Sequence, residues 1–262
     1  MIIDSHVHFG NTPRFHCPLS LLVSLMSAEG IDKAVISYLG GAEVDHPDTG
    51  RPAFSRVEQF GILKRTVDAV NLHPGMLYGQ LWIQPKLGGY SADLERAVAE
   101  NRSAIVGLKV HPYHSGLILT DPAYTPYFAM AERLKLPVAV HTASDIYSPA
   151  RAVYERALEF PDAVFIMVHM GLNTDHGEAV RLIGKLPNLY GDTTWVDTPS
   201  VVSAVKRLGS DKILFGTDAP ISGPDNYEKY GEMLAALKSE LSAGEYDDVL
   251  WRNASRLFGI PV

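Results

Sequence analysis

The chain has 262 residues, of which 46% are hydrophobic and 20% are charged. This composition is ordinary for a globular protein and excludes a disordered segment or a fibrous repeat. The net charge of −7 leaves no cationic surplus for holding a phosphate backbone, so we expect no nucleic-acid partner.

The sequence also carries signals of its compartment. No apolar stretch approaches the ~18 to 20 residues of a membrane span, and the first residues lack the pattern of a cleavable leader. The single cysteine, Cys17, cannot form an intrachain disulfide, which is typical of a reducing compartment. We therefore expect a cytoplasmic protein with no membrane partner.

Short apolar runs without polar alternation recur along the chain. They include residues 104–108, 138–140, 164–168 and 213–215. Continuous apolarity indicates burial on both faces, as in a parallel sheet covered by helices. Between the runs lie segments of helical periodicity, such as residues 150–160, where Val153, Ala157 and Phe160 share one face. The alternation predicts βαβ units.

Eight predicted strands are spaced about 30 residues apart. Their expected ends lie near His8, Ser37, Trp82, Lys109, His141, His169, Asp192 and Asp218. This number and spacing predict a (β/α)8 TIM barrel, a parallel eight-stranded barrel formed by one domain over residues 1–262. An open doubly wound sheet needs fewer strands and a glycine-rich first turn, which residues 8–11 lack. Short C-terminal helices are expected at residues 246–250 and 253–258, packed on the outside.

The first predicted strand carries His6 and His8. Because they are two residues apart, their side chains leave the same face of the strand and can hold one metal ion. With 10 histidines in the chain, chance alone supplies about 0.4 such pairs, so the pair by itself has little weight. Its meaning depends on the residues that accompany it.

Further polar residues end other buried strands: His141, His169 and Asp218. In a parallel barrel the carboxyl ends of all strands meet at one rim, where active sites are built, so these side chains are expected to converge with His6 and His8. Imidazoles and one carboxylate suit zinc or a similar divalent ion. The alternative is that each is only a hydrogen-bonded residue of the rim.

With these residues the sequence resembles the amidohydrolase superfamily. The resemblance is to its branch of short metal-dependent barrels, which includes hydrolases, decarboxylases and hydratases of small carboxylated compounds. The resemblance spans the chain. It rests on the segments at residues 4–8, 107–112, 169–171, 215–220 and 253–259, together with His141. It implies one divalent ion, Zn or Mn, held by His6, His8, His141 and Asp218. It also implies that His169 contacts the metal-bound water or the substrate.

Lys109 ends the fourth strand, where some superfamily members place a carboxylated lysine that bridges two metals. A free ammonium cannot ligate a cation, but it can bind a substrate carboxylate beside His111, which lies two positions further along the strand. Related short barrels with a similar segment suggest one metal, so we expect Lys109 to be unmodified and to bind substrate with His111. A lysine paired with a carboxylate of the rim is the remaining alternative.

Three further residues are expected to line the pocket: Trp195 after the seventh strand, and Arg14 and Arg51 in the loops after the first two. Asp4 lies deeper on the first strand and is expected to be a buried orienting group. Five other histidines fall in predicted loops or helix starts, where solvated side chains are common. They are His16, His46, His73, His114 and His176.

The function expected from these residues is a metal-dependent hydrolase of a small carboxylated lactone, amide or ester. Asp218 accepts the proton of the water, His169 polarises the substrate and Lys109 anchors a carboxylate. A metal-dependent lyase, either a decarboxylase or a hydratase, is the alternative, and a non-catalytic metal- or metabolite-binding barrel is the second alternative. The chain is short for the branch, so the pocket is either more open or completed by a neighbouring subunit in a homo-oligomer.

Overall fold

The computed structural model describes residues 1–12, 14–46 and 57–262. Its strands form one sheet in the order β2-β1-β3-β4-β5-β6-β7-β8-β9. The strands are β1 (Ile3–Asn11), β2 (His16–Cys17), β3 (Lys33–Tyr38), β4 (Leu77–Trp82), β5 (Ile105–Val110), β6 (Val138–Ala143), β7 (Phe165–Leu172), β8 (Leu189–Asp192) and β9 (Ile213–Leu214). All pairs from β1 to β9 are parallel, whereas β2 pairs antiparallel with β1. The eight predicted strands are thus confirmed, and β2 is an addition.

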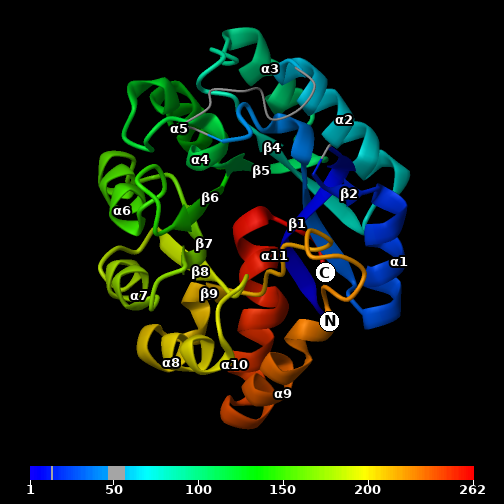
Figure 1. Ribbon diagram of the computed structural model, residues 1–262, viewed down its shortest axis with the longest axis vertical. Coiled ribbons are helices and arrows are strands. Elements are labelled where there is room, and N and C mark those ends of the chain that lie inside the picture. The colour runs from blue at the N-terminus through cyan, green and yellow to red at the C-terminus, as the bar shows by residue number, and fades with distance from the viewer. Residues whose placement is uncertain (13, 47–56) are drawn as a thin grey trace.

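The sheet closes on itself between β1 and the chain that follows β9. Val7 forms a parallel bridge with Ala219. The Ser5 N–H donates to Phe215 O at 2.9 Å, and the His8 N–H donates to Ala219 O at 2.8 Å. Together with the ring of helices around the strands, this closure makes the molecule the predicted TIM barrel (Figure 1).

Helices follow the strands along the chain, and most of them cover the outside of the barrel (Figure 1). They are α1 (Leu19–Glu29), α2 (Gln59–Leu72), α3 (Ala92–Glu100), α4 (Pro112–Ser115), α5 (Thr125–Leu134), α6 (Ala150–Glu159), α7 (Gly177–Ile183), α8 (Thr198–Leu208), α9 (Gly231–Glu240), α10 (Ala243–Asp247) and α11 (Asn253–Phe258). The helix predicted at residues 150–160 is α6. Side chains cap several starts: the Ser91 hydroxyl accepts the Leu94 N–H of α3, and the Asp197 carboxylate accepts the Ser200 N–H of α8. Among the described helices, none is long and apolar enough to cross a membrane.

The last helix corrects one prediction. α11 does not pack on the outside but covers the N-terminal end of the barrel, where it lies over the centre of the ring (Figure 1). Its Ala254 and Phe258 pack against apolar side chains inside that end: Ile3, Val35, Tyr78, Val106, Ile166, Tyr190 and Leu214. Asn253 fixes the helix, because its buried amide donates to Ser210 O and Ile213 O. The cavity lined by the predicted site residues lies at the opposite end of the barrel.

Candidate active site

A cavity of about 140 Å³ lies at the carboxyl ends of the strands, and we call it the catalytic cavity because the candidate catalytic residues line it. It is lined by His6, His8, Phe15, Leu39, Trp82, Lys109, His111, His114, His141, His169, Leu172, Asp218 and Ile221. The histidines and Asp218 that the sequence analysis placed at strand ends thus share one cavity. Two of these lining residues have φ in the left-handed region, His169 (68°) and Asp218 (66°), and so does Trp195 (56°), whose indole contacts Asp218. Such strained conformations concentrate at functional sites.

Three side chains within this cavity form the tightest group of candidate metal ligands. One ligand atom from each of His6, His8 and Asp218 lies within 4.8 Å of the others. The two histidine Nε2 atoms are 3.1 Å apart, and Asp218 Oδ1 lies 2.8 Å from His8 Nε2 and 3.5 Å from His6 Nε2. The backbone keeps these residues in place, because the Asp218 N–H donates to His6 O at 2.8 Å across the seam of the barrel.

Neighbouring acceptors orient both imidazoles. His6 Nδ1 lies 3.3 Å from Asp192 Oδ2 and 3.2 Å from Thr194 Oγ1, and His8 Nδ1 lies 2.8 Å from Ser37 Oγ. With acceptors at Nδ1, each neutral ring carries its proton there and presents the Nε2 lone pair to the cavity. Two lone pairs and a carboxylate oxygen then face one another, an arrangement that a cation stabilises.

The protonation states agree with cation binding. Burial lowers the pKa of His6 well below its ordinary value and also lowers the pKa of His8, so both rings are neutral at pH 7. Burial by itself raises the pKa of Asp218, but its close contact with His8 and the neighbouring His6 and His169 side chains hold that pKa well below the usual value. Neutral imidazoles and an ionised carboxylate are the forms that bind a divalent ion.

Lys109 reaches the middle of this group. Its Nζ lies 2.7 Å from His6 Nε2, and the side chain is 1% exposed. Burial lowers the pKa of Lys109 to about 8, although Asp218 and Asp192 oppose the shift. Because the Nε2 lone pair serves one partner at a time, His6 would give up this contact if it held a metal ion, and the Lys109 ammonium would then be available to a ligand in the cavity.

His141 lies in the cavity but outside the group of three. Its ring stacks on His111, with centroids 3.8 Å apart, and His111 stacks in turn on Trp82 at 5.6 Å. The predicted four-residue ligand set is therefore assembled only for His6, His8 and Asp218. Burial lowers the pKa values of His141 and His111, so this stack is uncharged.

His169 lies between the ligand group and His141, with ring centroids 5.6 Å from His6 and 4.8 Å from His141. Its Nδ1 lies 3.2 Å from Thr194 O, which holds the proton on Nδ1 and leaves Nε2 as an acceptor. Its N–H donates to Asp192 Oδ1 at 2.8 Å. Burial lowers the pKa of His169 to about 4, so the ring is neutral at pH 7.

The remaining predicted pocket residues differ in their surroundings. Trp195 is not among the residues that line this cavity but lines a neighbouring one, and its indole N–H donates to Asp218 Oδ2 at 2.9 Å. Arg14 does not line the cavity, since its guanidinium pairs with Asp45 at the surface, and Arg51 lies outside the described residues. Asp4 is buried as expected: its carboxylate accepts hydrogen bonds from the Thr217 hydroxyl and the His6 N–H.

Sequence reasoning missed several residues of the site. Asp192 was recognised only as a strand end, yet its carboxylate contacts both His6 and the His169 backbone. His114 was expected to be solvated but lines the cavity, with Nδ1 2.9 Å from Val44 O. His176 is also buried, against Met170 O. The position of Asp192 after an apolar run was the available signal, whereas nothing local marks a histidine in a loop as buried.

Comparison with known proteins decides the family. The model of a family described as Amidohydrolase (Amidohydro_2) matches residues 3–260. The chain belongs to this amidohydrolase family. Its members depend on a divalent metal, and the chain is an enzyme of this family. No curated protein matches the sequence.

Solved structures with the same fold carry several different activities. A 2,6-dihydroxybenzoate decarboxylase bound to 2,6-dihydroxybenzoate has a TM-score of 0.69 and 19% identity, covering 98% of each chain. A putative 2-pyrone-4,6-dicarboxylic acid hydrolase from Pseudomonas putida has a TM-score of 0.69 and 16% identity, covering 100% of this chain and 98% of the other. A 4-oxalomesaconate hydratase from Rhodopseudomonas palustris has a TM-score of 0.63 and 18% identity, covering 99% of this chain and 96% of the other. At these identities the likeness shows the fold alone.

Proposed function

We propose that this amidohydrolase is a metal-dependent hydrolase of a small carboxylated lactone, amide or ester. The observation that carries the proposal is the convergence of two imidazole lone pairs and one carboxylate oxygen from His6, His8 and Asp218. A divalent cation, Zn²⁺ or Mn²⁺, supplies Lewis acidity when it is bound there. His141, in the same cavity, is proposed as a further ligand.

The chain's own groups supply the proton transfers and the binding. Asp218 is ionised and holds one oxygen toward the histidines, so it accepts a proton from the attacking water and returns it to the leaving group. His169, neutral and with Nε2 unprotonated, orients that water or the substrate. Lys109 and His111 bind the substrate on the side of β5 and α4.

The cavity favours a small anionic substrate. Its volume is about 140 Å³, and Lys109 is the one cationic side chain among its described lining residues, because burial keeps the histidines there neutral. A charge-assisted hydrogen bond from a buried ammonium to a carboxylate is strong because water is excluded. The named compounds of two structural neighbours, a benzoate and a dicarboxylic acid, are also carboxylates.

A lyase is the second candidate, because the structural neighbours include a decarboxylase and a hydratase on the same fold. The same side chains serve these reactions: Asp218 or His169 delivers a proton to carbon after loss of carbon dioxide, or removes one from the water that adds to a double bond. The residue types of the site are common to all three reactions.

We propose the cytoplasm as the location, in keeping with the free, buried thiol of Cys17.

The test is a substrate screen with zinc-loaded and manganese-loaded protein on carboxylated lactones, amides, esters and unsaturated acids, and on aromatic acids. Product analysis by mass spectrometry separates hydrolysis from addition of water and from release of carbon dioxide. The His6→Ala/His8→Ala double variant is the control for contaminating activity. Hydrolysis by the wild type alone supports the proposal, whereas turnover only of aromatic or unsaturated acids establishes the lyase. Metal-loaded protein without activity on any class contradicts both.

A further inference from the structure

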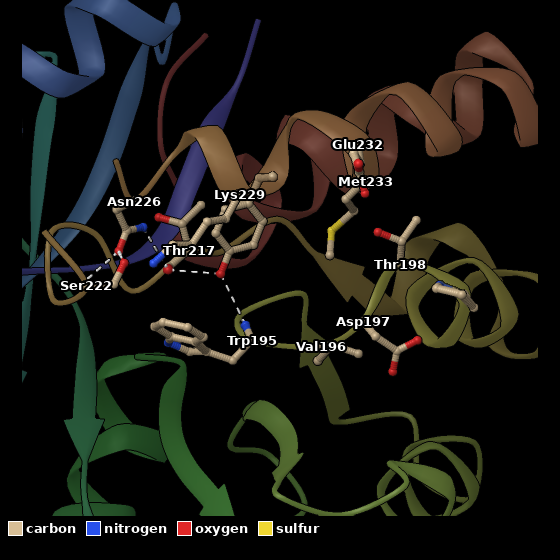
Figure 2. Close-up of a pocket in the computed structure, with 12 residues that line it drawn as sticks. Trp195, Val196, Asp197, Thr198, Thr217, Ser222, Asn226, Lys229, Glu232 and Met233 are labelled. Carbon is tan, nitrogen blue, oxygen red and sulfur yellow. Dashed lines mark hydrogen bonds between the residues drawn. The ribbon is translucent and has the colours of Figure 1, made fainter. Parts of the chain in front are cut away.

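A second cavity lies on the other side of Trp195 from the catalytic cavity. It has a volume of about 490 Å³ and opens between the β8–α8 loop and the segment that contains η5 (Glu228–Tyr230) and α9 (Figure 2). We call it the Trp195 cavity. Thr217 lines it while the next residue, Asp218, lines the catalytic cavity. The two cavities are therefore back to back, with the Trp195 indole bonded to Asp218 Oδ2 between them.

Hydrogen bonds hold the walls of the Trp195 cavity in a fixed shape. The Tyr230 hydroxyl donates to Thr217 O at 3.0 Å and accepts the Trp195 N–H at 3.1 Å. The Asn226 amide donates to the same carbonyl at 3.2 Å, and the Ser222 hydroxyl donates to Asn226 Oδ1 at 2.6 Å. These bonds join the loops after β8 and β9, so the cavity is formed before any ligand arrives.

The lining chemistry combines an aromatic face, apolar walls and one cation. The Trp195 side chain is 40% exposed, and the Lys229 ammonium lies 5.4 Å from the centroid of its ring. Met233 points into the space from α9 (Figure 2). Among the described lining residues Lys229 is the one cation; the Asp197 carboxylate is engaged by the Ser200 N–H. The other carboxylate of the lining, Glu232, lies next to Met233 on α9 (Figure 2).

We propose that the Trp195 cavity is a second binding site, for a small carboxylic acid with a planar apolar body such as an arylcarboxylate. The ring of the ligand packs on the indole and against Met233, while its carboxylate pairs with Lys229. The volume of about 490 Å³ falls within the range of ligand pockets and exceeds that of the catalytic cavity. This site is separate from the catalytic residues and does not depend on the proposed reaction.

A ligand in the Trp195 cavity also acts on the catalytic cavity. It contacts the face of the indole whose N–H holds Asp218 Oδ2, so any shift of the ring changes the position and charge balance of a candidate metal ligand. Because coupling between two binding events is reciprocal, metal in the catalytic cavity alters the affinity of the Trp195 cavity by the same factor. The Trp195 cavity is thus a regulatory site: ligand binding there affects Asp218 through the hydrogen bond from the Trp195 indole.

The binding test uses benzoate as the probe and isothermal titration calorimetry as the measurement. Lys109→Met is the background, because it removes the cation of the catalytic cavity. We expect benzoate to bind this variant. Adding Lys229→Met to it is expected to weaken benzoate binding about tenfold or more. Adding Lys238→Met, which removes an exposed lysine of α9 outside the cavity, is expected to leave the affinity unchanged. No binding to Lys109→Met, or equal binding with and without Lys229, overturns the proposal.

The coupling test uses cobalt(II) in place of the metal and follows its visible absorption. Benzoate is expected to change the cobalt spectrum of Lys109→Met but not that of Lys109→Met/Trp195→Phe. The double variant should still bind benzoate, because phenylalanine keeps an aromatic wall in the cavity. An identical spectral response in both variants overturns the role of the indole N–H. A protein that takes up no cobalt contradicts the proposed metal site and the coupling, while the calorimetric comparison still decides the cavity.

Discussion

Among the single residues of the site, the position of the proton on each histidine ring matters as much as the position of the ring itself. Asp192, Thr194 and Ser37 contact the Nδ1 atoms of His6 and His8, so the Nε2 lone pairs converge. Outer partners of this kind fix the tautomer and orientation of metal-binding histidines. The predictions at this scale therefore separate residues that hold the metal from those that act on the substrate.

The first prediction concerns metal content. The purified protein is expected to hold about one divalent ion per chain, and His6→Ala/His8→Ala is expected to lose it, because two of the three convergent ligand atoms are removed. Elemental analysis of both proteins measures the result. His176→Ala, which removes a buried histidine outside the cavity, is the control. Equal metal in the wild type and the double variant would show that the ion is bound elsewhere.

The second prediction concerns His169. The variant His169→Ala is expected to retain most of the metal but to lose about 10²- to 10⁴-fold in kcat, the usual contribution of a group that moves or orients a proton. The separation follows because His169 lies outside the group of three ligand atoms and its Nε2 is free. Metal analysis and kinetics on the same preparation give both values. If metal and activity fall together, His169 is itself a ligand.

The third prediction concerns Lys109. The variant Lys109→Met is expected to keep the single ion and to raise KM for carboxylated substrates, since a charge-assisted hydrogen bond typically contributes ~1.5 to 3 kcal/mol. Lys238→Met is the matched control, because it removes an exposed lysine of α9 that lines neither cavity. A requirement for bicarbonate and about two metal ions per chain would show instead that Lys109 is carboxylated and bridges two metals.

At the scale of elements, loops around the catalytic cavity are joined by a buried carboxyl group. Glu43 follows η1 (Leu39–Gly41) and is 6% exposed. Its carboxylate accepts the Leu87 N–H at 2.8 Å, and its own N–H donates to His114 O at 2.9 Å. The loops after β3 and β4 are thereby fixed to α4, which carries His114 into the cavity.

The fourth prediction follows from the protonation of Glu43. Burial raises the pKa of Glu43 to about 7, so the folded protein binds a proton that the unfolded chain releases near the ordinary value of 4.5. The cost of ionising Glu43 in the fold therefore grows between about pH 5 and pH 7, and stability falls as pH rises. Glu43→Gln removes this cost and is expected to be more stabilising at pH 8 than at pH 5 by about 1 to 3 kcal/mol.

Urea unfolding of the wild type and Glu43→Gln at both pH values measures this difference. Glu155→Gln, an exposed glutamate in the middle of α6, is the control and should show no such dependence. A stability difference that is the same at pH 5 and pH 8 would mean that Glu43 has one charge state throughout this range.

The fifth prediction concerns the helix that closes the barrel. Phe258 of α11 is 4% exposed and packs inside the N-terminal end, so Phe258→Ala is expected to lower the free energy of unfolding by about 3 to 5 kcal/mol. Leu158→Ala, at a 53% exposed position of α6, should cost less than about 1 kcal/mol. Metal content should be unchanged in the folded Phe258→Ala protein, because the ligands lie at the opposite end. Loss of the metal would contradict this separation.

At the scale of the whole molecule, the two ends of the barrel have different tasks. Apolar side chains and α11 fill the N-terminal end, whereas the carboxyl ends of the strands carry histidines, carboxylates and the strained backbones of His169, Trp195 and Asp218. Stability and chemistry can be altered separately for this reason, as is general for TIM barrels.

The barrel, and the end of it that carries the candidate site, could be predicted from the sequence alone. Its buried strands are continuous apolar runs of regular spacing, and each ends in a polar residue, so parallel topology alone places His6, His8 and Asp218 at one rim. Only the tertiary structure decided which of these side chains converge. It stacks His141 on His111, brings Asp192 to His6 and places Trp195 between two cavities. These are contacts between residues far apart in the chain, whose distances depend on barrel closure and on loops after the strands. No local pattern of residue types encodes them.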